Sequence, residues 1–105
     1  MSADNGIYIL KTKEGQIRVI HDKAIDNIFD SNESYNSTQL VQYFGQTPYT
    51  RDMNVAVNIA QRMYKAIPYC EYGIVILPEC DKTWNQIMRE YNTNSMNRDR
   101  GGTLY

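Results

Sequence analysis

The sequence predicts a single small α+β domain, with one mainly antiparallel sheet and helices packed on it, in the order β-β-α-β-α-β-α. Three observations carry this prediction. The chain has 105 residues, too few for two independent cores. Its apolar residues form short β-branched runs in some segments and recur at helical spacing in others. Turn-forming residues separate these segments, and no internal repeat or linker divides the chain.

Two runs rich in β-branched residues open the domain, at residues 7–12 and 16–21. The connection between them contains Gly15, which favours a β-hairpin. Because side chains alternate along a strand, one face should carry Ile7 and Ile9 and the other face Tyr8 and Leu10. The hairpin is therefore predicted to be apolar on both faces.

The next segments predict a short helix, a loop and a third strand. Asp22 is expected to cap a helix over residues 23–29, whose apolar stripe comprises Ala24, Ile25, Ile28 and Phe29. The polar segment 30–39 has no periodicity, and its length makes it a candidate binding loop on the surface. Residues 40–44 then predict a short strand that Gly45 closes.

The second half predicts two helices around one strand. Thr50 is expected to cap a helix over residues 51–67, and its apolar residues recur at spacings of three and four: Val55, Ala56, Ile59, Ala60, Met63, Tyr64 and Ile67. Residues 72–77 are apolar throughout, which is typical of a central strand covered on both faces.

The last predicted element is a helix capped by Asp81. Its apolar residues lie at i, i+3, i+4 and i+7: Trp84, Ile87, Met88 and Tyr91. Residues 93–105 lose this periodicity and predict a polar tail, so that the single domain spans residues 1–105.

Charge and apolar content exclude several classes of protein. Eleven Lys and Arg stand against 12 Asp and Glu, which argues against a protein that binds bulk nucleic acid through its phosphates. No segment is apolar enough for a signal peptide or a membrane span, so we expect a cytoplasmic protein without a membrane partner. Cys70 and Cys80 flank the strand predicted at 72–77 and should lie roughly 30 Å apart, too far for a disulfide or a shared metal.

Two features raise the question of catalysis. Gly6, Ile7 and Tyr8 match the first motif of GIY-YIG nucleases, but the second strand lacks the Tyr-Ile-Gly motif and the predicted first helix lacks arginine. His21 is the single histidine, and no metal-ligand spacing surrounds it. We therefore predict no catalytic residue, metal or cofactor, although His21 could still act as a general acid or base with Asp4, Glu71 or Tyr49.

Recognition of a small anionic ligand is the chemistry that the remaining residues favour. The helix start at Thr50 and Arg51 would offer backbone N–H groups to an anion, and the tail would add arginine and tyrosine side chains; a helix cap and a disordered tail explain the same residues. The predicted ligand-binding residues are Asp4, Asn5, Tyr8, His21, Tyr49, Thr50, Arg51, Arg98, Arg100 and Tyr105.

Tyrosine is unusually frequent, with nine copies beside two Phe and one Trp. Its flat ring and terminal hydroxyl suit recognition surfaces as well as cores. Tyr64, Tyr72 and Tyr91 are expected on the packed faces of predicted elements. That leaves four tyrosines free for recognition, namely Tyr8, Tyr35, Tyr49 and Tyr105.

Several short stretches are similar to a family of small uncharacterised tailed-bacteriophage proteins that begin SADNGIYI. They are Ser2 to Leu10, Ala24 to Asn27, Tyr43 to Gly45, Tyr49-Thr50, Glu71 to Ile74 and Trp84. This resemblance covers most of the chain and implies a setting, the infection of bacteria, but it supplies no catalytic residues.

In that setting, we expect a non-enzymatic counter-defence protein that sequesters a nucleotide-derived signalling molecule, with its pocket at a homo-oligomer interface. One alternative is a protein–protein inhibitor of a host defence or metabolic enzyme, with Tyr35 as an anchor. A second alternative is a small phosphoester-cleaving enzyme that uses His21.

Overall fold

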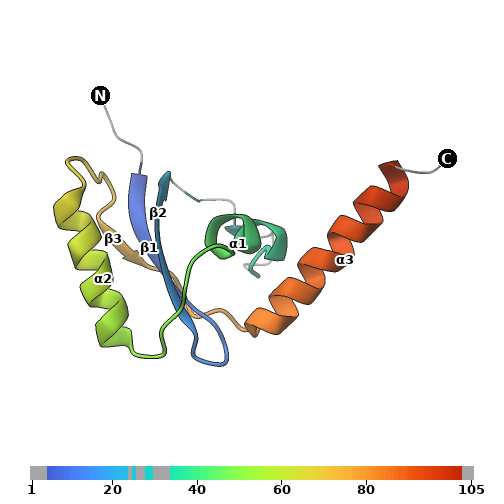
Figure 1. The fold of residues 1–105 in the computed structure, drawn as a ribbon, viewed down its shortest axis with the longest axis horizontal. Helices are drawn as coiled ribbons and strands as arrows, with labels where there is room; N and C mark the ends of the chain where they lie inside the picture. The colour runs from blue at the N-terminus through green and yellow to red at the C-terminus, as the bar shows by residue number, and fades with distance from the viewer. Residues whose placement is uncertain (1–4, 24, 26–27, 30–33, 103–105) are drawn as a thin grey trace.

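The computed structural model describes residues 5–23, 25, 28–29 and 34–102, with side chains up to Asn94 (Figure 1). Its elements in chain order are β1 (Asn5–Lys11), β2 (Ile17–Lys23), α1 (Ser37–Phe44), α2 (Met53–Ala66), β3 (Ile74–Ile76) and α3 (Trp84–Gly102). The strands form one sheet in the order β2-β1-β3, in which β2 is antiparallel and β3 parallel to β1. The described chain is therefore a small α+β fold with a mixed sheet.

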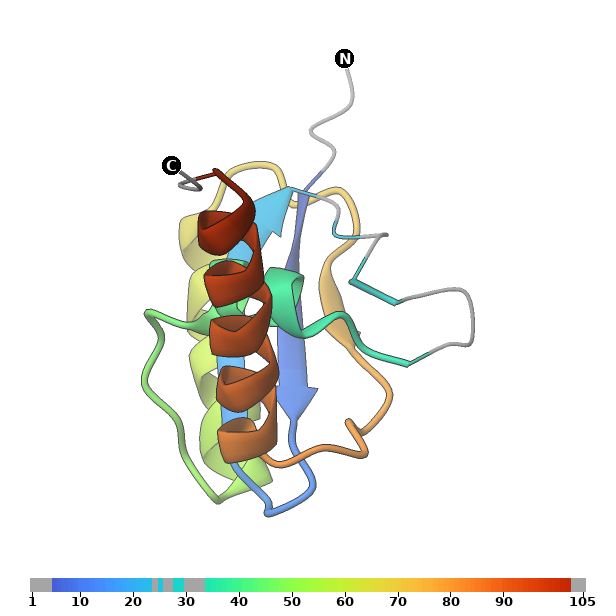
Figure 2. The ribbon, with the colours of Figure 1, turned by 90° about the vertical axis from the view of Figure 1, so that its right-hand side faces the viewer.

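The sheet lies between two helical layers. Figure 1 shows α2 on one face, and Figure 2 shows α1 and α3 on the other. Ile7 and Ile9 pack with the α2 alanines, whereas Tyr8 and Leu10 pack with apolar residues of α1 and α3, including Phe44. The prediction that the hairpin is apolar on both faces is confirmed, and β1 is the strand covered on both sides.

The strand predicted at residues 72–77 is shorter and lies elsewhere in the sheet. It is β3, an edge strand of three residues that pairs with β1 alone, and Ile76 is 62% exposed. A continuous apolar run indicates apolar neighbours on both faces, and Ile74 and Val75 do contact opposite layers. The run does not distinguish an edge strand from a central one, so the predicted central position was wrong.

Residues 40–44 form part of a helix, which corrects both the predicted order and the mainly antiparallel sheet. The α1 helix begins after Asn36, whose side chain accepts the Gln39 N–H at 3.1 Å. Leu40 and Phe44 lie one turn apart and are fully buried. A segment of five residues with four apolar side chains fits a strand or a buried helical turn equally well. The Asn36 cap, which lies within the segment predicted as a loop, shows that it is a helix.

The hairpin continues beyond the predicted end of its second strand. Asp22 pairs with Gly6 inside β2, so it does not cap a helix there. Of the helix predicted at 23–29, residues 24 and 26–27 lie outside the described residues, while Ile25 and Ile28 are buried. Residues 30–33 of the predicted loop also lie outside them.

The caps of both later helices lie two residues after the predicted ones. Asp52 caps α2 by accepting the Asn54 N–H at 2.9 Å. Thr83 and Gln86 form a reciprocal capping box at the start of α3, with side-chain to backbone distances of 3.2 and 2.8 Å. The α3 backbone continues as far as Gly102, through most of the segment predicted as a tail, because a stretch without apolar periodicity can still be helical.

The two cysteines lie in different layers of the fold. Cys70 packs against the α2 layer, and the buried Cys80 belongs to the opposite core. Both are free thiols.

Candidate functional site

The free edge of β2 is the first part of the candidate site. Ile17 exchanges two backbone hydrogen bonds with Thr50, at 2.8 and 2.9 Å, so its N–H and C=O point away from β1. Because backbone direction alternates along a strand, those of Val19, His21 and Lys23 face the same edge. The Lys23 N–H is taken by the Asp22 carboxylate at 2.7 Å, and no described strand pairs with this edge beyond Ile17.

A cleft adjoins this edge and is the second part of the site. Its volume is about 250 Å³, and its lining comes from β2, α2 and the segment between α1 and α2: Ile17, Val19, Pro48, Tyr49, Thr50, Val55 and Ile59. Most of these side chains are apolar, and Tyr49, Val55 and Ile59 are each between 40 and 49% exposed. We call this feature the β2-edge cleft.

Arg18 holds one wall of the β2-edge cleft in place. Its guanidinium donates to the Thr47 carbonyl at 2.6 Å and to the Gln16 side chain at 3.1 Å. It also lies 3.9 Å from the centre of the Trp84 ring and 5.4 Å from that of Tyr49. Arg18 is only 6% exposed, and this burial lowers the pKa of its guanidinium. Arg18 thus connects β2, the cleft wall formed by residues 47–50, and the start of α3.

Arg51 is the exposed cation of the same region. Its guanidinium lies 5.6 Å from the centre of the Tyr49 ring and donates to the Glu14 carbonyl at 3.1 Å. Burial alone would raise the pKa of the Glu14 carboxyl, but hydrogen bonds from the Thr12 hydroxyl and the Trp84 amide lower it below its ordinary value. The charge of Arg51 acts in the same direction.

The start of α2 differs from the one on which the predicted anion site depends. Thr50 lies in the bridge to Ile17, two residues before the cap. The cap itself is Asp52, whose carboxylate already accepts an N–H of the first turn. A negative side chain at this position repels the anion that the free N–H groups would otherwise attract.

The predicted ligand-binding residues do not converge on one place. Tyr49, Thr50 and Arg51 lie together at the start of β2, whereas Asn5 and His21 lie toward the other end of the hairpin. From Ile17 to His21 the strand spans about 13 Å. Asp4 and Tyr105 lie outside the described residues, and Arg98 and Arg100 belong to α3 with side chains that are not described.

The exposure of the tyrosines contradicts much of their predicted division into packed residues and residues free for recognition. Tyr8 is 6% exposed and Tyr35 is 3% exposed, so both belong to the core and neither is free for recognition. The Tyr35 hydroxyl donates to the Pro78 carbonyl, and burial raises the pKa of this phenol. Tyr64 and Tyr72, which were expected to be packed, are about half exposed.

His21 is exposed on the β2 edge. Tyr49, one of its predicted catalytic partners, lines the cleft at the other end of this edge. Within the described residues, no three His, Cys, Asp or Glu side chains come close enough together to hold a metal ion. Glu71, another predicted partner, donates its backbone N–H to the Asn5 side chain, toward the end of the hairpin where His21 lies. The phosphoester-cleaving alternative therefore stays a prediction.

Val55 and Ile59 are the site residues that sequence reasoning placed in the core. They lie one position to the side of the α2 stripe that contacts the sheet, which contains the fully buried Ala56 and Ala60. The signal was present in the sequence, since the apolar residues of this helix cover more than the single stripe that one sheet face can bury.

Comparison of this chain with family models, with curated proteins and with solved structures finds no match. The resemblance to tailed-bacteriophage proteins therefore stays a prediction. Within the described range, no helix combines the length and the apolar character that crossing a membrane requires.

Proposed function

We propose that this protein is a non-enzymatic binding protein that takes an extended segment of another protein along the free edge of β2. The observation that carries the proposal is the β2-edge cleft, which opens beside Val19. The backbone N–H and C=O of Val19 point to this edge of the sheet, away from β1. Strand addition combines backbone hydrogen bonds with pockets for alternate side chains; the β2 edge would supply the backbone groups and the cleft one such pocket. In the setting that the resemblance implies, the partner would be a host defence or metabolic enzyme.

The size and lining of the cleft support this reading over a nucleotide pocket. Sites for small molecules usually measure about 300 to 1,000 Å³, whereas this cleft measures about 250 Å³. One buried aliphatic side chain gains about 1.5 to 3 kcal/mol, which is a useful anchor for a strand that also forms backbone bonds. Arg18, which contacts the cleft wall at Thr47, already has two acceptors in the chain.

Ile59→Glu tests the proposal because it places a carboxylate in the cleft. Ile59 is 40% exposed, so the change should cost little stability. A fluorescent β-strand peptide with one isoleucine should bind the wild type and lose at least tenfold in affinity for this variant. Asn58→Glu is the matched control, since it adds the same charge at an exposed neighbouring position. Equal losses in the two variants, or no binding to the wild type, would refute the proposal.

Arg51 favours a second candidate, which is sequestration of a nucleotide-derived molecule. Tyr49 and Arg51 form an exposed aromatic and cationic pair at the cleft, and a base on the ring would leave its phosphate near the guanidinium. A second copy of the chain could enlarge the pocket at a homo-oligomer interface. A panel of nucleotides should then raise the thermal midpoint of the wild type and not that of Arg51→Gln; a panel without any shift removes this candidate.

A further inference from the structure

The edge of β2 changes chemical character along its length. Val19, His21 and Lys23 point to the α2 face, because alternate residues of a strand share a face. The edge is therefore apolar at Val19, beside the cleft, and polar at His21 and Lys23, where it carries an imidazole and an ammonium group. Both of the latter residues are exposed.

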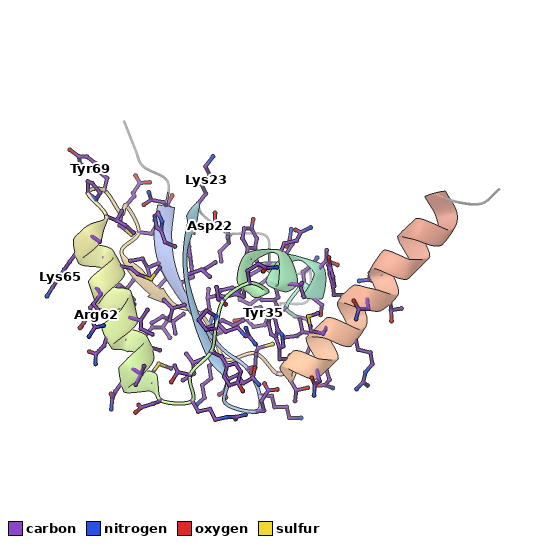
Figure 3. All side chains as sticks on the ribbon, viewed as in Figure 1. Asp22, Lys23, Tyr35, Arg62, Lys65 and Tyr69 are labelled. Carbon is purple, nitrogen blue, oxygen red and sulfur yellow. The ribbon has the colours of Figure 1, made fainter. Side chains whose placement is uncertain are left out.

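The side of α2 next to the cleft also changes from apolar to basic residues along its length. Val55 and Ile59 line the cleft, and Arg62 lies seven and three residues further along, on the same side of the helix. Figure 3 shows Lys23 at the end of β2 and Arg62 and Lys65 on the outer side of α2. Along β2 the apolar cleft is thus followed by the exposed Lys23, while Arg62 and Lys65 add positive charge on the outer side of α2.

Of the described acidic residues in this region, Asp22 and Asp52 do not face those cations. Asp22 lies on the opposite face of β2, and its carboxylate accepts the Lys23 N–H. Asp52 lies at the opposite end of α2 from Lys65, where it caps the helix. The salt bridge in the described part of the chain joins Lys82 and Glu90 on the other side of the sheet.

We propose that the partner of this site is an acidic extended segment, an inference that rests on the proposed strand addition. The segment pairs antiparallel with β2, in the direction that Thr50 already takes against Ile17. It places an apolar side chain opposite Val19 and, four residues earlier, a carboxylate opposite Lys23. Both side chains then project on the α2 face, since residues i and i+4 of a strand point the same way.

The geometry also fixes the order of the motif. An antiparallel strand meets Lys23 before it meets Val19, so the acidic residue precedes the apolar one. A polar residue such as threonine fits between them, opposite His21. Opposite charges facing each other across a strand pair contribute modestly, so exchanging Glu for Lys in the partner should change affinity by about three- to tenfold.

A set of matched peptides tests this inference. One peptide carries Glu, Thr and Ile at alternate positions, a second has Lys in place of Glu, and a third has the Glu sequence with N-methylated backbone amides on its pairing side. We expect the Glu peptide to bind the wild type about three- to tenfold more tightly than the Lys peptide, with a difference that shrinks as salt rises. Lys23→Glu should reverse this preference, and Lys13→Glu, with the same change of net charge at the distant hairpin turn, should keep it.

The outcomes separate the two proposals. If the Glu and Lys peptides bind the wild type equally, the inferred acidic partner is wrong while strand addition stands. If neither peptide binds more tightly than the N-methylated one, strand addition fails and the inference fails with it. A preference for Glu that survives Lys23→Glu would also overturn the inference, because the carboxylate then contacts another site.

Discussion

Replacing Arg18 with methionine tests the structural support of the β2-edge cleft. The change keeps most of the side-chain volume and removes a guanidinium that has two hydrogen-bond acceptors and a Trp84 ring at 3.9 Å. A hydrogen bond that involves a charged group contributes about 1.5 to 3 kcal/mol. A desolvated cation over an aromatic face adds about 2 kcal/mol.

Two effects offset part of this loss in the free energy of unfolding. The Nε atom of Arg18 is buried and has no hydrogen-bond partner among the described residues, and removing such a group recovers about 1 to 3 kcal/mol. Methionine also avoids the cost of burying a charge. The net expectation for Arg18→Met is a loss of about 2 kcal/mol in the free energy of unfolding, or about 8 °C in the thermal midpoint of a domain of this size.

Chemical and thermal unfolding measure this loss, and fluorescence locates it. Trp84 is the single tryptophan, so its emission should shift when the guanidinium beside it is removed. Peptide affinity should fall as well, because the cleft wall formed by residues 47–50 loses the hydrogen bond between Arg18 and the Thr47 carbonyl. Arg89→Met, at an exposed position on α3, is the control. If Arg18→Met costs no more than this control, within about 0.5 kcal/mol, Arg18 does not support the cleft.

Three further changes probe the fold around the site. Thr83→Ala should cost about 1 kcal/mol in denaturant unfolding because it removes a helix cap. Tyr35→Phe should cost about 1 to 3 kcal/mol, since the Pro78 carbonyl loses its donor, and should leave peptide affinity unchanged; a selective loss of affinity would return Tyr35 to the binding surface. Hydrogen bonds, chiefly that from Ser37, lower the pKa of Glu90 below its ordinary 4.5. The stabilisation from ionised Glu90 should therefore be complete above pH 4.5 and be lost as the pH falls through the lowered pKa. Glu90→Gln should flatten that acid dependence.

The hairpin could be predicted from the sequence because its determinants are local. Alternating apolar residues and Gly15, at φ +93° in the turn, define β1 and β2 without reference to distant segments. The same holds for α2, whose apolar spacing is decisive over most of its length. The ends of the helices were harder to predict, since Thr50, Asp52, Asp81 and Thr83 are all acceptable caps and only the tertiary contacts select among them.

The site could not be predicted because it depends on which edge stays open. Ile59 belongs to an apolar pattern, and whether it is buried depends on where the sheet ends beneath α2. The parallel pairing of β3 with β1 leaves β2 at the edge, and residues 74–76 contain no sequence signal that predicts this pairing. Tyr35 was misread for a related reason: the polar residues around it indicate a loop, while its ring fills the core formed by α1 and α3.

Hydrogen–deuterium exchange at the β2 edge tests strand addition most directly. The amides of Val19 and His21 face this edge, where Lys23 already has an acceptor. When the wild type is saturated with the Glu peptide, we predict that exchange at these two amides slows by at least tenfold, while the amides of α3 keep their rates. If the peptide binds and both edge amides exchange as fast as in the free protein, the partner does not pair with β2 and the proposed mode of binding is wrong.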